Sequence, residues 1–263
     1  MTLTGEALAG IALEAGAVIM DIYATDFDVA TKGDASPVTA ADEKAEAIIL
    51  SALQALAPDI PVLAEEAVSA GDIPEIGDRF FLVDPLDGTK EFVHKRGEFT
   101  VNIALIENGR PVMGVVFAPA MDRLFVADSV SSAWQASAKA GGVVPPASER
   151  SPLHIRNQSG ALTAIASKSH RTPETDAFLE KYDVAEIISA GSSLKFCLIA
   201  AGEADIYPRM GRTMEWDTGA GQAVVEAAGG IVLEEDGTPL RYGKTARGYD
   251  NPHFIVYGDV TPV

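Results

Sequence analysis

The sequence predicts an α+β protein made of two halves, and three observations support this prediction. Two stretches near the N-terminus, residues 4–23 and 41–56, repeat apolar residues at helical spacing. Short apolar runs follow, and two of them flank Asn108-Gly109, a dipeptide that favours a hairpin turn. Beyond residue 152 the pattern changes to strands that alternate with helices. We therefore expect helices on an antiparallel sheet, followed by a second α/β half.

The strands expected in the first half are apolar runs bounded by polar or turn-forming residues. Pro58 and Pro61 end the second helix, because proline cannot continue a helix. One apolar run ends at Asp84-Pro85. The runs lie over residues 61–63, 79–83, 99–106, 112–117, 124–127 and 133–136.

A stretch rich in Ala, Gly, Pro and Ser, residues 138–152, is the best candidate for a boundary. We accordingly divide the chain into residues 1–145 and residues 146–263. The second half is expected to contain strands over residues 162–166, 186–189, 205–207, 231–233 and 254–257, and helices over residues 173–182, 193–201 and 216–228.

Composition excludes several classes of protein. The 263 residues carry a net charge of −18, so the chain lacks the basic footprint of a nucleic-acid-binding protein. About half of the residues are apolar, which favours a packed core, and the single cysteine, Cys197, lies in an apolar stretch typical of that core. The sequence contains neither a signal peptide nor a run of ~20 apolar residues that would span a membrane. We expect a cytoplasmic protein and leave open peripheral attachment at the inner face of the membrane.

Acidic residues stand at four places where a predicted element begins or ends. Glu65-Glu66 follows the strand over residues 61–63, and Asp84 to Thr89 follow the strand over residues 79–83. Asp217 lies in the first turn of a helix, and Asp42 begins another. Each has a simpler interpretation: helix N-termini favour acids, a glutamate pair suits a solvated loop, and Asp-Gly is common in turns.

The run from Asp84 to Thr89 is more specific than the other acidic sites. Pro85 fixes its own φ angle and restrains Asp84, so that two carboxylates three residues apart can turn to one side. The Leu86 carbonyl between them completes an all-oxygen set that suits a hard divalent cation. Gly88 lets the chain turn, which leaves the amides of Gly88 and Thr89 to hold a phosphate oxygen.

Clustered carboxylates repel one another, and without cations some of them would stay protonated at neutral pH. Two or three Mg²⁺ ions would remove this penalty. They would also lower the pKa of a water molecule, bind phosphoryl oxygens and stabilise a leaving oxygen.

These motifs together resemble the inositol monophosphatase superfamily, and within it the bacterial 3'(2'),5'-bisphosphate nucleotidases. One departure is Gly219-Ala220-Gly221, where the family more often has an alanine pair. The segments that carry the superfamily resemblance are Ser36-Pro37-Val38-Thr39-Ala40-Ala41-Asp42, Glu65-Glu66, Asp84 to Thr89 and Glu215-Trp216-Asp217-Thr218. The segments that resemble the nucleotidases are Asp84 to Phe92, Gly97-Glu98-Phe99-Thr100-Val101-Asn102 and Gly191-Ser192-Ser193-Leu194-Lys195-Phe196-Cys197.

The resemblance implies a layered α-β-α-β-α sandwich and the hydrolysis of adenosine 3',5'-bisphosphate to AMP and phosphate, with inhibition by lithium. Glu65, Asp84 and the Leu86 carbonyl would bind one metal ion. Asp84, Asp87 and Asp217 would bind a second. Asp42 and Thr89 would orient and deprotonate the attacking water. The substrate-binding residues would be Glu65, Leu86, Asp87, Gly88, Thr89, His170, Ser192, Ser193, Lys195, Arg209 and Asp217.

The segment Ser192-Ser193-Leu194-Lys195 distinguishes between substrates. A helix N-terminus with two hydroxyls and an ammonium suits an anion. An inositol monophosphate has one phosphate, which the metals take, so a second anion site favours a bisphosphate. The alternative is that Ser192 only caps the helix and Lys195 is solvated.

Arg209 and His170 are weaker candidates for substrate contacts. Arg209 follows a strand and could meet a phosphate or pair with a surface acid, and His170 could contact ribose or adenine or simply lie in an exposed loop. Tyr207 and Trp216 are more typical of the core than of base stacking.

Two other functions compete with the nucleotidase hypothesis. One is another sugar or inositol phosphatase of the same superfamily. The other is a non-catalytic metal- or nucleotide-binding regulator, which the presence of every metal-binding and water-activating position opposes. The expected partner is a small bisphosphorylated nucleotide. The sequence leaves open a monomer or a homodimer, the sulfated analogue as a substrate, 3' or 2' preference, the number of metal ions at rest and the strength of lithium inhibition.

Overall fold

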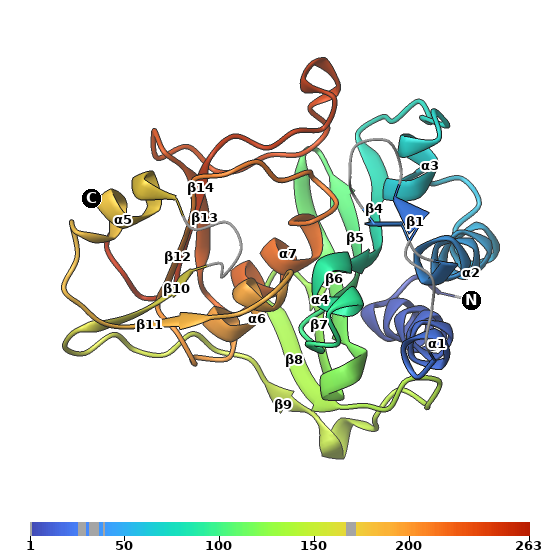
Figure 1. The fold of residues 1–263 in the computed structure, drawn as a ribbon, viewed down its shortest axis with the longest axis horizontal. Coiled ribbons are helices and arrows are strands. Elements are labelled where there is room, and N and C mark those ends of the chain that lie inside the picture. The colour runs from blue at the N-terminus through green and yellow to red at the C-terminus, as the bar shows by residue number, and fades with distance from the viewer. Residues whose placement is uncertain (1, 26–29, 32–36, 39, 167–171) are drawn as a thin grey trace.

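The computed structural model describes residues 2–25, 30–31, 37–38, 40–166 and 172–263. Helices and sheets alternate in five layers, in the order α-β-α-β-α (Figure 1). Helices α1 (Gly5–Tyr23) and α2 (Ala40–Leu56) cover one face of a seven-stranded sheet. Helices α6 (Leu194–Ala200) and α7 (Gly219–Ala227) lie between this sheet and a five-stranded sheet, and α5 (Pro173–Leu179) forms the outer layer.

The seven-stranded sheet contains the predicted hairpin, with the turn at Asn108-Gly109. Strand β3 runs parallel to β4, and the remaining neighbours are antiparallel. A two-stranded ladder, β1 (Ala30–Thr31) with β2 (Pro37–Val38), lies apart from it. In spatial order the sheet comprises β3 (Val62–Ala64), β4 (Arg79–Asp87), β5 (Thr100–Glu107), β6 (Arg110–Ala118), β7 (Arg123–Ser129), β8 (Ser132–Ser137) and β9 (Ser151–Pro152).

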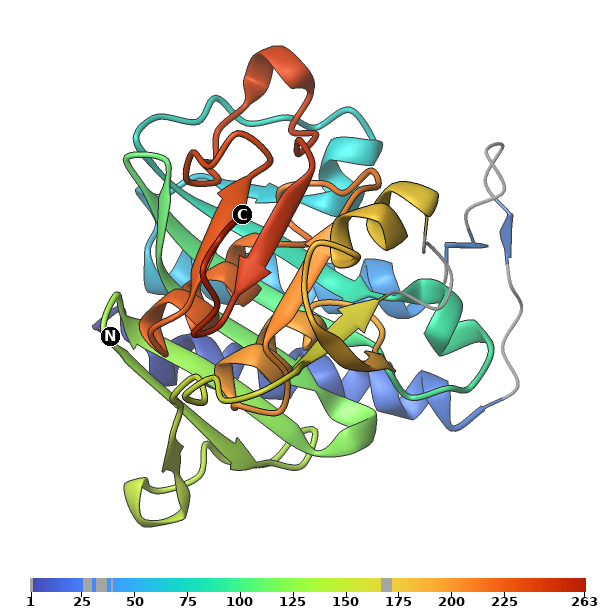
Figure 2. The ribbon, with the colours of Figure 1, turned by 90° about the vertical axis from the view of Figure 1, so that its left-hand side faces the viewer.

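The five-stranded sheet is seen from its own side in Figure 2, with helices α1 and α2 behind both sheets. Strand β10 is parallel to β11 and β12, whereas β14 is antiparallel to both of its neighbours. Because parallel strands end at the same edge, the segments after β11 and β12 emerge together. In spatial order the strands are β11 (Val184–Ser189), β10 (Leu162–Ala166), β12 (Ile206–Arg209), β14 (Phe254–Tyr257) and β13 (Ile231–Glu234).

Alternate side chains along a strand pack into different core clusters, one on each face of the sheet. In β4, Phe81 and Val83 pack with the residues of α1 and α2, whereas Phe80 and Leu82 pack with those of α6 and α7. Successive side chains of a strand point to opposite faces, so a strand covered on both sides reads as a continuous apolar run. The same rule operates in β14, where alternate residues join the central and the outer clusters.

Two glycines allow helix α7 to approach its neighbours closely. A Cβ on Gly114 of β6 would lie 2.7 Å from the Ala220 carbonyl oxygen. A Cβ on Gly221 would lie 2.6 Å from Cγ of Phe196 in α6. The departure from the family's alanine pair therefore leaves room for Phe196 between the two central helices.

Two local predictions were wrong near the acidic residues. Strand β4 continues to Asp87, with a register shift between Asp84 and Asp87 where Pro85 cannot donate to the ladder. Helix α7 begins at Gly219, so Asp217 lies in the turn before it. The Asp217 carboxylate accepts a hydrogen bond from the Met214 amide (2.8 Å), which holds that turn in place of a first helical turn. Within the described ranges, no helix is long and apolar enough to cross a membrane.

Candidate active site

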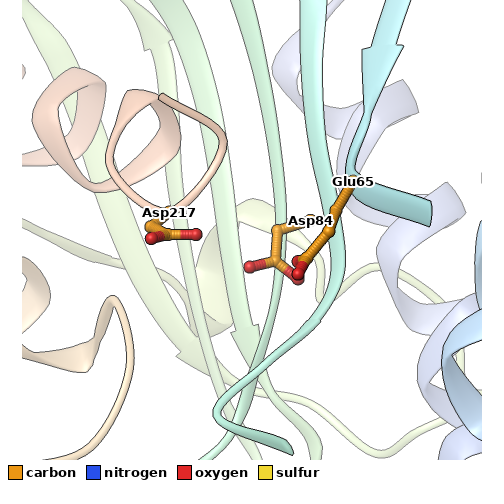
Figure 3. Close-up of side chains that lie close together, drawn as sticks. All are labelled: Glu65, Asp84 and Asp217. Atoms are coloured by element: carbon orange, nitrogen blue, oxygen red, sulfur yellow. The ribbon is translucent and has the colours of Figure 1, made fainter. Parts of the chain in front are cut away.

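Three acidic side chains from distant parts of the sequence meet between the two sheets. Glu65 begins the short helix α3 (Glu65–Ser69), Asp84 lies in β4, and Asp217 precedes α7. One carboxylate oxygen from each lies within 4.8 Å of the others. Figure 3 shows Glu65 and Asp84 side by side, with Asp217 facing them from the other half of the molecule.

The run from Asp84 to Thr89 folds back on itself beside this cluster. The Leu86 amide donates to Oδ1 of Asp84 (3.0 Å), and the Thr89 hydroxyl donates to the Leu86 carbonyl (3.4 Å). Gly88 has a φ angle of +93°, and a Cβ there would collide with Oγ of Ser192. Only glycine satisfies both constraints. Helix α4 (Thr89–Val93) starts directly after it.

Two serines connect this run to the second half of the chain. Oγ of Ser192 lies 2.8 Å from the carbonyl oxygens of both Asp87 and Glu98, which share its single proton. The Ser193 amide donates to Oδ2 of Asp87 (2.7 Å), and the Ser193 hydroxyl donates to the Asp217 carbonyl (2.6 Å). Both hydroxyls bond within the protein, so a role for either in binding substrate stays a prediction.

The turn that carries Asp217 is held by a buried carboxylate that was not among the residues predicted for the site. Glu215 is fully buried and accepts hydrogen bonds from the amides of Gly243 (2.7 Å) and Lys244 (2.8 Å). Nζ of Lys244 pairs with the same carboxylate at 2.9 Å. Asn251 adds a bond to the Met214 carbonyl (2.8 Å). The only signal for Glu215 was its place in the Glu215 to Thr218 motif.

A second unanticipated carboxylate holds Glu65. Glu46 in α2 is 5% exposed, and its two oxygens accept the amides of Glu66 (2.8 Å) and Ala67 (2.8 Å) at the start of α3. Glu46 lies four residues after Asp42 on α2, so both project from one face of the helix. That spacing could have identified Glu46 from the sequence. Asp42 is also buried, and its charge adds to the rise that burial causes in the pKa values of Glu65 and Asp84.

Burial raises the pKa values of Glu65, Asp84, Asp87 and Asp217, and the charges of neighbouring carboxylates add to the rise for Glu65, Asp84 and Asp217. Burial, followed by the charge of Asp217, raises the pKa of Glu65 to about 9. Burial and the charge of Asp87 raise the pKa of Asp217 to about 7. The pKa of Asp84 lies well above its usual value, from burial and then from Glu65. Burial also raises the pKa of Asp87, against the opposing effect of Lys195.

These residues fit a divalent cation. The donors are all oxygen, as hard cations require, and their crowding is unfavourable without positive charge. Oγ1 of Thr100 and Oδ1 of Asn102 are buried beside the cluster and have no hydrogen-bond partner among the residues that the structure describes. Such oxygens suit a site that receives a hydrated ion.

A cavity of about 380 Å³ adjoins the acidic cluster. Its lining includes Asp87, Thr89, Lys195, Arg209 and Asp217. The cavity therefore combines part of the proposed metal site with two cationic side chains.

Lys195 is buried, which rules out the alternative of a solvated lysine. Its Nζ donates to the carbonyl oxygens of Ser192 (2.7 Å) and Ala190 (3.4 Å). Burial lowers the pKa of Lys195 to about 8, and the charge of Asp87 opposes that shift. Ser193, not Ser192, occupies the position before α6, and its side chain does not cap the helix.

The other residues considered in the sequence lie in different environments. Nη2 of Arg209 donates to the Arg212 carbonyl (2.8 Å), and its buried Nε has no partner in the described ranges. Tyr207 and Trp216 are buried in the core as predicted, and so is Cys197. His170 lies outside the residues that the structure describes.

The comparisons with known proteins agree with this geometry. A model of the inositol monophosphatase family matches residues 4–253. The chain belongs to the inositol monophosphatase family. It is 44% identical to the 3'(2'),5'-bisphosphate nucleotidase CysQ of Escherichia coli K12, over 94% of this chain and 96% of that protein. It is also 44% identical to CysQ of Salmonella typhimurium, over 95% and 98% of the two chains.

Solved structures of family members share the fold. CysQ from Bacteroides thetaiotaomicron superposes with a TM-score of 0.82 at 39% identity, covering 98% of this chain and 97% of that one. An IMPase of Thermotoga maritima superposes with a TM-score of 0.74 at 26% identity, covering 95% and 90%. The layered sandwich expected from the sequence is therefore confirmed as the fold of this family.

The raised pKa values predict how stability without divalent cations depends on pH. The folded protein holds protons on Glu65 and Asp217 up to about 9 and about 7, whereas the ordinary pKa values are 4.5 and 3.8. Because the folded state binds more protons across this window, its free energy of unfolding falls as the pH rises. We expect the melting temperature in chelator to fall by several degrees between about pH 5 and about pH 9. A melting temperature that stayed constant would contradict the repulsion.

Proposed function

We propose that this chain is a Mg²⁺-dependent 3'(2'),5'-bisphosphate nucleotidase that hydrolyses adenosine 3',5'-bisphosphate to AMP and phosphate. The observation that carries the proposal is the position of the acidic cluster against a cavity lined by Lys195 and Arg209. The metal site accounts for one phosphate, and the cationic side chains account for a second. The names of the relatives that match along nearly the whole chain support the same activity.

The protein residues divide into groups that hold cations and groups that handle protons. Glu65, Asp84 and the Leu86 carbonyl would hold one cation. Asp84, Asp87 and Asp217 would hold another, and the proposal allows a third. Bound cations would offset carboxylate repulsion, make water more acidic and stabilise the leaving oxygen. The number of carboxylates gathered there supports two or three Mg²⁺ per site.

Thr89 and Asp42 would orient the attacking water and take its proton. The Thr89 hydroxyl lies at the start of α4, beside the Leu86 carbonyl (3.4 Å). Asp42 is buried near enough to Glu65 and Asp84 for its charge to raise both pKa values. Backbone amides at a helix start lack partners within the helix, so those of Gly88 and Thr89 suit the oxygens of the reacting phosphate.

The rest of the substrate would extend away from the acids. A second cavity of about 350 Å³ shares Arg209, Arg212 and Asp217 with the first. Two adjoining cavities suit a nucleoside better than a single phosphorylated ring. Lys195 and Arg209 would bind the phosphate that is not hydrolysed, and Ser192 and Ser193 would border it. We further propose a cytoplasmic location, because adenosine 3',5'-bisphosphate is a small anion of intermediary metabolism, and a monomer or homodimer as the active form.

A substrate panel tests the activity directly. Phosphate release should be fastest from adenosine 3',5'-bisphosphate, with kcat/KM at least about a hundredfold above that for inositol 1-phosphate, since only the first carries a second phosphate for the cationic side chains. A chelator should abolish release, and excess Ca²⁺ or Li⁺ should reduce it. Mg²⁺ demands tight octahedral geometry that Ca²⁺ does not reproduce. Higher efficiency on inositol 1-phosphate would contradict the nucleotidase and favour the sugar phosphatase.

Neutralising the central carboxylates tests the metal site. Asp84→Asn and Asp87→Asn should each abolish turnover, because an amide binds Mg²⁺ poorly. Each should also raise the melting temperature in chelator, since repulsion is relieved. Asp128→Asn is the matched control: this carboxylate also has a raised pKa, but it accepts a hydrogen bond from Trp134 (2.7 Å) outside the cluster. A cluster variant with near-normal kcat would refute the assignment.

Removing Lys195 tests the second phosphate site. Lys195→Ala should lower kcat/KM for the bisphosphate by about ten- to a hundredfold, because a charge-assisted contact contributes roughly 1.5–3 kcal/mol. Hydrolysis of a simple monophosphate should change little. Lys139→Ala, at an exposed lysine outside the cavity lining, removes the same charge as a control. Equal losses on both substrates would show that Lys195 serves the metal site or the fold.

A further inference from the structure

Asn102 is a buried amide at the contact between the two halves, and its NH₂ group has no role in the activity derived so far. It lies in β5 directly opposite Asp84 in the ladder and is 1% exposed. Its Nδ2 lies 3.0 Å from Oγ of Ser193 and 3.3 Å from Oδ2 of Asp87. One side chain therefore touches a proposed metal ligand in the first half and the segment before α6 in the second.

The hydrogen bonds around Asn102 allow only one consistent assignment of donors and acceptors. The Ser193 hydroxyl has a single proton, which it donates to the Asp217 carbonyl (2.6 Å), so it can only accept from Asn102. The Asp87 carboxylate, when ionised, can also only accept. Both neighbours thus require the NH₂ group of Asn102 to face them, and the chemistry fixes the orientation of the amide. The Ser193 amide completes the arrangement by donating to the same oxygen of Asp87 (2.7 Å).

The position is an unfavourable one for an asparagine that serves only the fold. Alternate residues of β5 place Asn102 on the face that carries Ala104 and Ile106 into the central core. A buried amide costs free energy unless all its groups are bonded, and Oδ1 of Asn102 has no partner among the described residues. An apolar residue would suit the fold better there. The bonds to Asp87 and Ser193 are what the asparagine adds.

We propose that Asn102 is a positioning residue that fixes Asp87 and, through Ser193, the turn that carries Asp217, so that both carboxylates are held ready for a divalent cation. This inference rests on the proposed function, because it assigns Asp87 and Asp217 to the metal site. Without Asn102, Asp87 loses one donor to Oδ2 and keeps the Ser193 amide. Ser193 loses the donor that orients its hydroxyl toward Asp217. Side chains that orient metal ligands typically affect metal affinity by about 10–100-fold.

The test compares Mg²⁺ dependence in Asn102→Ala and in the unchanged protein. Two readouts are measured: the Mg²⁺ concentration for half-maximal activity, and the rise in melting temperature when Mg²⁺ is added to chelator-treated protein. We expect the variant to need about tenfold or more Mg²⁺ for both. At saturating Mg²⁺ its kcat should recover most of the lost activity. Loss of structure alone would not be reversed by Mg²⁺.

Gln222→Ala is the matched control for removing a buried amide. Gln222 in α7 is 1% exposed, donates to Glu226 (2.7 Å) and the Leu240 carbonyl (3.2 Å), and accepts from the Tyr242 hydroxyl (2.7 Å), so these bonds do not involve an acid of the cluster. Its loss should lower the melting temperature equally with and without Mg²⁺ and leave the Mg²⁺ concentration for half-maximal activity unchanged. If Asn102→Ala fails to fold, Asn102→Thr keeps a residue suited to a strand but cannot reach both acceptors, and the same outcomes apply.

A double-mutant cycle with Ser193→Ala tests the connection itself. If the Asn102 amide acts through the Ser193 hydroxyl, the combined variant should need less additional Mg²⁺ than the product of the two single effects. Independent effects, or an Asn102→Ala variant with the Mg²⁺ dependence of the unchanged protein, would overturn the inference. If the unchanged protein itself showed no dependence on Mg²⁺, the proposed function would fail instead, so the two failures are distinguishable.

Discussion

Repulsion between buried carboxylates is the constraint on which the rest of the structure depends. Glu65, Asp84 and Asp217 present oxygens within 4.8 Å of one another, and burial and mutual charge raise each pKa. Such a cluster would separate unless the backbone around it were fixed. A different buried side chain holds each segment: Glu46 caps the helix that begins with Glu65, and Glu215 anchors the turn that carries Asp217. The site is built from rigid surroundings, which is what a preorganised cation site requires.

The layered fold creates this arrangement because the site lies where the seven-stranded sheet meets the central helical layer. The seven-stranded sheet supplies Asp84 and Asp87 from one long strand, and the turn before α7 supplies Asp217 from the central layer. In the five-stranded sheet β11 and β12 flank β10, and the segment after β11 and the end of β12 bring Ser193 and Arg209 to the same place. Neither half holds the complete set of acids, so both must fold before the site exists.

The protein carries a net charge of −18 yet has a cavity suited to an anion. The charged groups nearest the cavity determine whether it can bind an anion, because charges separated by more than about 8 Å of salt solution are largely screened. Lys195 is held against two carbonyl oxygens and near Asp87, and Arg209 is fixed through the Arg212 carbonyl. Their positions are set by the protein before any ligand arrives. A cation on the acids and these two side chains would together reverse the field of an acidic surface.

The sequence by itself determined the features that depend only on residues close together along the chain. Apolar spacing located both N-terminal helices, Asn108-Gly109 fixed the hairpin, and the run from Asp84 to Thr89 marked the acids, because propensity, periodicity and turn chemistry are local. Only the tertiary structure showed that Lys195 is buried and that Asn102 contacts Ser193, a residue 91 positions away. A buried amide in an apolar strand gives no local signal of its partner. Its role exists only once two distant segments have packed against each other, and packing is a property of the whole chain.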